Sequence, residues 1–105
     1  MTIKEEFMRW HKSHPNFMTP YIKELDVVDD IVIELSKGEG FDYKPLYGVS
    51  AIKKTIDNFK VVDKINNIDS NKPFQDLDKA QYYFKKLKVR LEECKKNKCE
   101  IKTYG

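Results

Sequence analysis

The chain has few of the residues that mark specialised classes of protein. Its 105 residues include two cysteines, two histidines, four glycines, four prolines and one tryptophan. The longest purely aliphatic run is Ile31–Ile33, far short of the ~20 apolar residues of a membrane span or the ~7–15 of a signal-peptide core. Two cysteines are too few for a disulfide framework, so we expect Cys94 and Cys99 to be reduced thiols in a soluble, cytoplasmic protein.

What the chain does contain is charge and lysine. Charged residues make up 35% and apolar residues 40% of the sequence, which is typical of a folded protein and not of a disordered one. The length predicts a single domain over residues 1–105. Eighteen lysines stand against two arginines. Together with many Ile, Asn and Tyr residues, this bias indicates an AT-rich genome, such as that of a low-GC bacterium, a plasmid or a phage.

Two segments have the spacing of amphipathic helices, at residues 2–14 and 76–97. Thr2 and Glu5 have the spacing of a capping box, which marks a helix start. In each segment the apolar residues recur at steps of three and four, which predicts one buried stripe per helix. The stripe residues are Ile3, Phe7, Trp10 and His14 in the first helix, and Leu77, Ala80, Phe84, Leu87, Leu91 and Cys94 in the second.

Between the helices, β-branched residues and alternation predict strands at about 28–36, 45–53 and 58–65. The third strand has an alternative, because Ile52, Ile56 and Phe59 also recur at helical spacing.

Two connecting segments have weaker signals. Thr19–Pro20 favours a short helix over residues 21–25. Residues 66–73 have the composition of a loop.

These elements predict an α+β fold in the order α-β-β-β-α. We expect a three-stranded antiparallel sheet with the N- and C-terminal helices packed on one face. On the other face, Val32, Leu46 and Val62 would form an exposed apolar patch, for which a second copy of the chain is one candidate partner, giving a homodimer.

The predicted element order is similar to that of the double-stranded-RNA-binding domain. That family opens its last helix with a lysine cluster and packs it through small alanines. The corresponding stretch here, FQDLDKAQYYF, has two acids and large aromatic residues. Since Asp76 and Asp78 would face phosphates, the resemblance stays at element order and does not carry the family's function over.

The glycines of KGEGFDYKPLYG raise the question of a phosphate-binding loop. Gly38 and Gly40 would need a third glycine at position 43 for the dinucleotide fingerprint, but that residue is Tyr43. We interpret them as hairpin glycines, and Gly48 as a strand glycine that marks a bulge or close packing.

The same stretch is the candidate surface for a protein partner. It places aromatic rings beside lysines on a connection between two predicted strands, and such connections often carry binding residues. The predicted partner-binding residues are Lys37, Phe41, Tyr43, Lys44 and Tyr47.

The last helix offers an alternative function, in nucleic-acid binding. Residues 76–102 hold nine basic and five acidic residues, so this part carries the positive surplus of the chain. A lysine-lined helix can contact a phosphate backbone electrostatically. The residues predicted for that role are Lys79, Tyr82, Lys85, Lys86, Lys88, Arg90 and Lys95.

Metal binding and catalysis have little support in the sequence. His11, His14, Cys94 and Cys99 would make a zinc site if the chain ends met, but Cys94 and His14 lie on the predicted apolar stripes, where the commoner role is packing. Adjacent acids point to different faces, so they do not form carboxylate pairs. We therefore expect no metal, no cofactor and no catalytic residues, and predict a non-enzymatic binding module for a protein partner.

Overall fold

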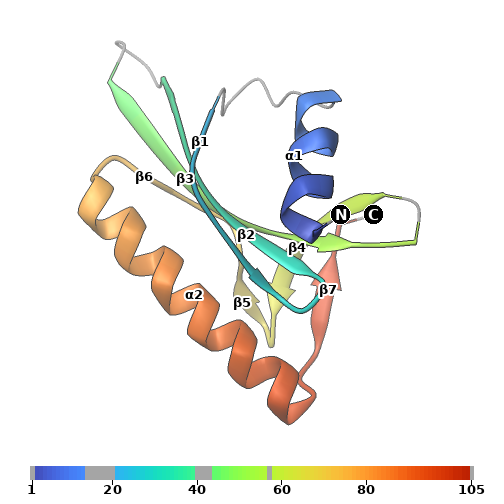
Figure 1. Cartoon of the computed structure of the whole chain (residues 1–105). Helices are drawn as coiled ribbons and strands as arrows, with labels where there is room; N and C mark the ends of the chain where they lie inside the picture. Colours follow the sequence, from blue (N-terminus) through green and yellow to red (C-terminus); the bar gives the residue numbers. More distant parts are fainter. Residues whose placement is uncertain (1, 14–20, 40–43, 57, 105) are drawn as a thin grey trace.

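Two helices and seven β-strands are present in the computed structural model (Figure 1), which describes residues 2–13, 21–39, 44–56 and 58–104. The α+β class predicted from the sequence is confirmed. Within the described ranges, no helix is long and apolar enough to cross a membrane. The elements are α1 (Ile3–Ser13), β1 (Tyr21–Val28), β2 (Ile31–Glu39), β3 (Pro45–Lys54), β4 (Phe59–Ile65), β5 (Ile68–Asp69), β6 (Lys72–Phe74), α2 (Leu77–Asn97) and β7 (Ile101–Thr103).

The strands form one antiparallel sheet in the order β1-β2-β3-β4-β5, with β6 paired to β3 and β7 paired to β4. The prediction of a three-stranded sheet is therefore wrong. Because the element order α-β-β-β-α does not hold either, the chain does not share its element order with the double-stranded-RNA-binding domain. β5, β6 and β7 have two or three residues each, which is too short to show the alternation by which a strand is recognised. β5 and the first two residues of β6 lie in the segment 66–73 that we expected to be a loop.

The first hairpin also differs from the prediction. Residues 21–25 begin strand β1 and do not form a short helix. Val28 pairs with Ile31 across a turn in which Asp29 has φ of 52°, so the predicted strand 28–36 spans the end of β1 and the start of β2. A register shift between Ile22 and Glu24 interrupts the alternation of β1, because a bulge moves the following side chains to the other face.

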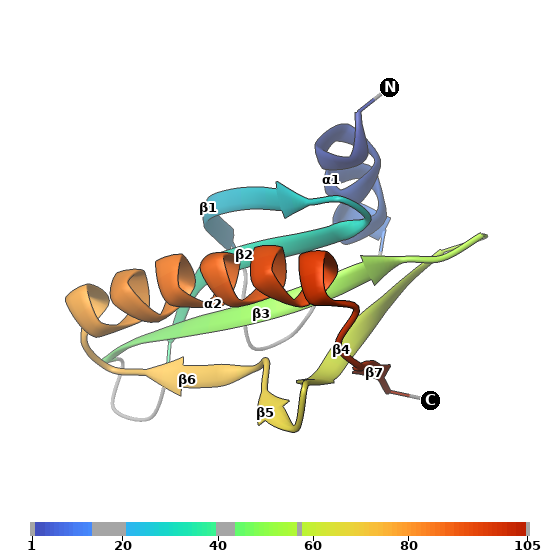
Figure 2. The same ribbon diagram turned by 90° about the horizontal axis from the view of Figure 1, so that it is seen from below.

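One face of the sheet packs against α2. Asp76 caps this helix by accepting a hydrogen bond from the Asp78 backbone N–H at 2.9 Å. The register pairs Ile33 with Ala51, and such opposed residues share a face. Figure 2 shows α2 lying along this face of the sheet. Together with the helix stripe they form the larger buried cluster: Val28, Ile31, Ile33, Leu35, Tyr47, Val49, Ala51, Val62, Ile65, Ala80, Phe84, Leu87, Leu91 and Cys94.

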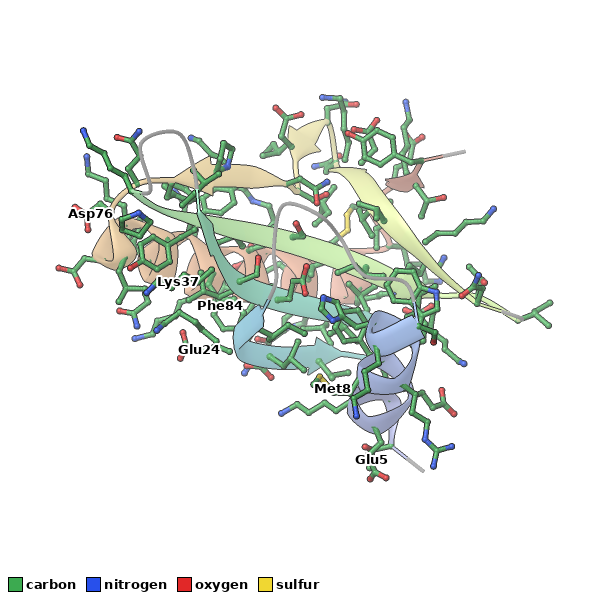
Figure 3. All side chains as sticks on the ribbon, turned by 90° about the horizontal axis from the view of Figure 1, so that it is seen from above. Glu5, Met8, Glu24, Lys37, Asp76 and Phe84 are labelled. Atoms are coloured by element: carbon green, nitrogen blue, oxygen red, sulfur yellow. A yellow bond between two sulfur atoms is a disulfide. The ribbon has the colours of Figure 1, made fainter. Side chains whose placement is uncertain are left out.

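The opposite face packs against α1, so the prediction that both helices share one face is wrong. Figure 3, viewed from the side opposite to Figure 2, shows α1 in front of the sheet and α2 behind it. Phe7 of α1 is fully buried against Val32, Ile52 and Phe59. The second face is apolar at this end, because the register Val32–Ile52–Val61 places three apolar side chains together. α1 therefore packs on this apolar end of the second face, apart from α2.

The expected exposed patch of Val32, Leu46 and Val62 does not exist. Val32 is fully buried on the α1 side, Val62 is fully buried on the α2 side and Leu46 is half-buried. A register shift between Val62 and Lys64 changes the alternation along β4, which places Val62 and Ile65 on the same side.

Candidate functional site

A cavity of about 200 Å³ lies on the α1 face of the sheet. Its walls combine aromatic and aliphatic side chains with four polar residues. α1 contributes the end of its buried stripe, and the central strands β2 and β3 contribute the floor. The lining residues are Trp10, His11, Glu34, Ser50, Ile52, Val61 and Asn71.

Glu34 is the unusual member of this cavity. The register Leu25–Glu34–Ser50 places it on the α1 face, in the middle of the sheet. Its side chain is 7% exposed, and its Oε2 has no hydrogen-bond partner in the described structure. Burial disfavours the charged carboxylate, which raises the pKa of Glu34 from 4.5 to about 7. A buried carboxyl oxygen without a hydrogen-bond partner costs stability, so Glu34 is an unusual residue for the interior of this sheet.

His11 supplies a second unpaired group. Its Nε2 is buried and also has no hydrogen-bond partner among the described residues. The imidazole ring lies 5.8 Å from the Phe7 ring, centroid to centroid. Trp10 packs on Phe59 with ring centroids 5.5 Å apart. The cavity therefore has an aromatic side from α1 and an acidic floor from β2.

The chemistry of this arrangement follows from the raised pKa. Near neutral pH the Glu34 carboxyl is divided between its acid and its carboxylate, so it can accept a hydrogen bond from a cation or exchange a proton. An apolar cavity with a few polar groups is the usual form of a ligand site. No cluster of three or more metal-binding side chains occurs within the described part of the chain.

A second hollow, of about 390 Å³, lies where β6 meets the start of α2. The rings of Phe74 and Tyr83 are 5.4 Å apart, and the Lys72 ammonium lies 5.6 Å from the centroid of each. The Tyr83 hydroxyl donates to the Asp69 carbonyl at 2.6 Å, which holds the ring in place. The residues around the hollow are Lys72, Phe74, Asp78, Lys79, Tyr82 and Tyr83.

The residues predicted to bind nucleic acid fall into three groups. Lys88 pairs with Asp26 and Lys95 pairs with Asp30, each at 2.8 Å. These two lysines tie α2 to the β1–β2 hairpin, and the hydrogen bond to Asp26 raises the pKa of Lys88. Arg90 lines a different hollow near the end of α2. The exposed residues of the predicted set are Lys79, Tyr82, Lys85 and Lys86, all in the first half of the helix.

Three of the five residues predicted to bind a protein partner belong to the described part of the chain. Phe41 and Tyr43 lie outside the described residues. Tyr47 pairs with Lys37 across β2 and β3 and is buried in the core on the α2 side, where it has a packing role. Lys44 is exposed.

Of the glycines nearby, Gly38 and Gly48 are strand residues, and Gly40 lies outside the described residues. Gly38 pairs with Leu46 inside the β2–β3 ladder, and Gly48 pairs with Ser36 and with Pro73.

The four candidate zinc ligands do not come together in the described structure. His14 lies outside the described residues, and His11 is on the α1 side of the sheet. Cys94 and Cys99 form a disulfide with their Cα atoms 4.9 Å apart, so the expectation of two reduced thiols is wrong. The bond forms because α2 ends at Asn97 and Lys98 turns the chain back with φ of 55°.

Sequence reasoning missed Glu34 altogether. It is the one charged residue in the run Ile31–Leu35, and alternation places it on the same face as Val32. We took that face to be solvated, where a glutamate needs no explanation. Only the position of α1 shows that the face is covered.

Comparisons with known proteins leave the site to be interpreted from its own geometry. The chain matches no family model, and neither the curated proteins nor the solved structures contain a match to it.

Proposed function

We propose that the chain is a non-enzymatic binding module for a protein partner, and that the cavity around Glu34 receives a basic side chain of that partner. The observation that carries the proposal is the buried Oε2 of Glu34, which has no hydrogen-bond partner in the described structure. An ammonium or guanidinium group would supply the missing donor and the opposite charge. The paired carboxylate would then be stable inside the cavity.

The walls of the cavity fit the stem of such a side chain. Lysine and arginine carry an apolar chain below the charged group, and Trp10, Ile52 and Val61 supply apolar surface next to Glu34. An aromatic ring beside a cation adds a further attraction. His11 and Asn71 provide polar atoms that can orient the incoming group.

The proposal is tested by NMR with labelled Glu34 and three small probes: acetyl-lysine amide, acetyl-arginine amide and uncharged acetyl-norleucine amide. We expect the two cations to lower the pKa of Glu34 and the uncharged probe to leave it unchanged. Glu34→Gln should abolish binding of the cations. Glu24→Gln, which neutralises an exposed acid of β1, is the matched control and should bind normally. Equal loss in both variants, or no response at Glu34, would contradict the proposal.

Nucleic-acid binding through α2 is a second candidate. It is supported by the hollow that combines Phe74, Tyr82 and Tyr83 with Lys72 and Lys79. Aromatic rings on which bases stack, flanked by lysines, are typical of sites for single-stranded nucleic acid. The acid Asp78 in the same hollow weakens the attraction for phosphate.

Fluorescence anisotropy with a single-stranded oligonucleotide at about 50 and 200 mM salt tests this candidate, because phosphate contacts weaken steeply over that range. Lys85→Ala/Lys86→Ala removes two exposed lysines and should reduce the affinity. Lys88→Ala/Lys95→Ala removes the same charge from lysines already paired with acids and should have a smaller effect. No binding at the lower salt would exclude this candidate.

Three further points belong to the proposal. The cytoplasm as the compartment and a phage, plasmid or low-GC bacterium as the source are predictions from composition. A second copy of the chain is one candidate for the partner. A basic residue of one copy entering the Glu34 cavity of another would make the molecular mass in solution depend on concentration, which sedimentation measures.

A further inference from the structure

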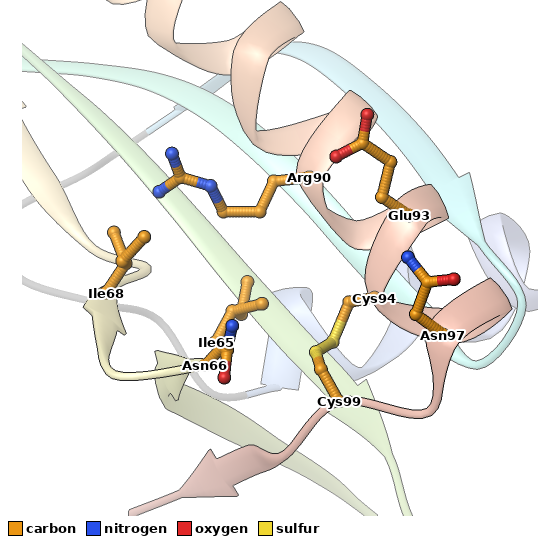
Figure 4. Close-up of a pocket in the computed structure, with 8 residues that line it drawn as sticks. All are labelled: Ile65, Asn66, Ile68, Arg90, Glu93, Cys94, Asn97 and Cys99. Carbon is orange, nitrogen blue, oxygen red and sulfur yellow. A yellow bond between two sulfur atoms is a disulfide. The ribbon is translucent and has the colours of Figure 1, made fainter.

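The disulfide between Cys94 and Cys99 lies in a hollow of its own, on the α2 side and apart from the Glu34 cavity. Figure 4 shows the bond beside Arg90, Glu93 and Asn97 of α2, facing Ile65 of β4, Ile68 of β5 and Asn66 of the turn between them. The hollow has a volume of about 210 Å³. A disulfide that lines an open hollow can be reached by a small molecule, whereas one sealed in the core cannot.

The two sulfurs differ in their surroundings. Cys94 is 5% exposed and belongs to the core cluster beneath α2, whereas Cys99 is partly exposed. An incoming nucleophile therefore reaches Cys99 more easily. Cys94 is close to the C-terminal end of α2, where the helix dipole disfavours a negative charge, so a Cys94 thiolate released there takes up a proton readily.

The charges around the hollow favour an anionic nucleophile. Arg90 lines the hollow directly, and Lys96 and Lys98 are close to the two cysteines in the sequence, whereas Lys95 is paired with Asp30. Glu93 is the one acid among the lining residues. Nearby cations stabilise thiolates, so a thiolate can approach Cys99 and a thiolate can leave.

We infer that Cys94–Cys99 is a reversible redox site that takes a thiol as its co-reactant. A thiolate attacks Cys99 Sγ, a mixed disulfide forms there, and the Cys94 sulfur leaves with the electron pair and then takes up a proton. A second thiolate attacks the co-reactant's sulfur in the mixed disulfide and releases the Cys99 thiolate, which is also protonated. The protein gains two electrons and two protons, and two thiols become one disulfide.

Reduction removes the covalent tie between α2 and the last strand. β7 pairs with β4 through Thr103–Val62, Lys102–Lys64 and Ile101–Ile65. Two further backbone bonds flank this ladder, from Asn66 N–H to the Glu100 carbonyl at 2.8 Å and from Tyr104 N–H to the Val61 carbonyl at 3.0 Å. A three-residue strand held by so few bonds opens more often once the disulfide is gone.

The chemistry is tested on the folded protein with glutathione and, separately, with dithiothreitol. Mass spectrometry after alkylation should find two free thiols with dithiothreitol and a glutathione adduct at Cys99 with limiting glutathione. An adduct confined to Cys94 would overturn the assigned point of attack. A disulfide that resists both thiols without denaturant would overturn the redox site itself.

The structural consequence is tested by hydrogen exchange. The Asn66 and Tyr104 amides should exchange roughly tenfold faster or more in the reduced protein, because the short covalent loop no longer limits opening. Amides of the β2–β3 ladder should be unchanged. Cys94→Ala/Cys99→Ala should exchange at the faster rate with or without thiol. Equal protection of Asn66 and Tyr104 in the oxidised and reduced proteins would contradict the role of the bond in holding β7.

Discussion

The two faces of the sheet are built in different ways. The α2 face buries a large cluster of apolar side chains between a five-strand path and a 21-residue helix. The α1 face has a buried cluster of four apolar residues, one of them from the 11-residue helix α1, and beside them a glutamate and a histidine with unpaired atoms. Stability is the evident purpose of the first face. The second gives up stability at Glu34, which is where a binding function is expected.

The largest effect on stability should come from removing a buried side chain on the α2 face. Leu91 is fully buried on the stripe of α2, and Leu91→Ala should lower the free energy of unfolding by about 2–5 kcal/mol. Urea unfolding measures this loss. Because Leu91 lies on the other side of the sheet, a folded variant should keep its response to acetyl-lysine amide. Loss of that response in the folded variant would show that the two faces are not independent.

The next largest effect is a pH dependence of stability, which comes from Glu34 on the α1 face. Burial raises the pKa of Glu34 from 4.5 to about 7, so between these values the unfolded chain has lost a proton that the folded protein retains. Stability from this group is therefore greatest below pH 4.5, falls as the pH rises to about 7, and is then constant. The total change is about 3 kcal/mol.

Glu34→Gln should remove this pH dependence. The difference in unfolding free energy between the variant and the wild type should therefore change by about 3 kcal/mol from pH 4 to pH 8, in favour of the variant at the higher pH. Glu24→Gln is the control, because that acid is exposed. Parallel pH profiles for the wild type and Glu34→Gln would contradict the assigned burial.

The smallest effect concerns the ion pairs that join α2 to the first hairpin. Lys88 and Asp26 are partly exposed, so water screens the pair and Lys88→Ala should lower the melting temperature only slightly. The hydrogen bond from Lys88 lowers the pKa of Asp26, so the stability from this pair is present above the ordinary aspartate pKa and is lost as the pH falls through the lowered value. Thermal unfolding at low and high salt measures the pair. A large fall in the melting temperature of the variant would mean that the stability of the α2 face depends on charge.

The sequence predicted the regions with a long, regular pattern. The stripe from Leu77 to Cys94 predicted α2 almost to its ends, and the capping box predicted the start of α1, where the Glu5 N–H donates to Thr2 Oγ1 at 3.2 Å. The bulge at Ile22–Glu24 interrupts the alternation that would have predicted β1. The register shift at Val62–Lys64 changes the alternation along β4, so the sequence assigned Val62 to the wrong face. Local patterns cannot show a bulge, since it depends on the neighbouring strand.

The candidate site was beyond sequence reasoning for a related reason. Glu34 and His11 are separated by more than twenty residues, and each is unremarkable in its own segment. Their proximity to one cavity depends on α1 packing on the face opposite to α2. Likewise, the pairing of Lys88 and Lys95 with Asp26 and Asp30 depends on how the first hairpin lies under α2. Tertiary packing decides which of the charged residues are available to a partner.

The most direct test of this account is the pKa of the Glu34 carboxyl in the free protein, measured by NMR of its side-chain carbon across the pH range. The account predicts a value of about 7, together with a fall in that value when a lysine or arginine probe binds. A value near the ordinary 4.5 would mean that the carboxylate already has a partner or is open to water. The proposed binding site on the α1 face would then lose its basis.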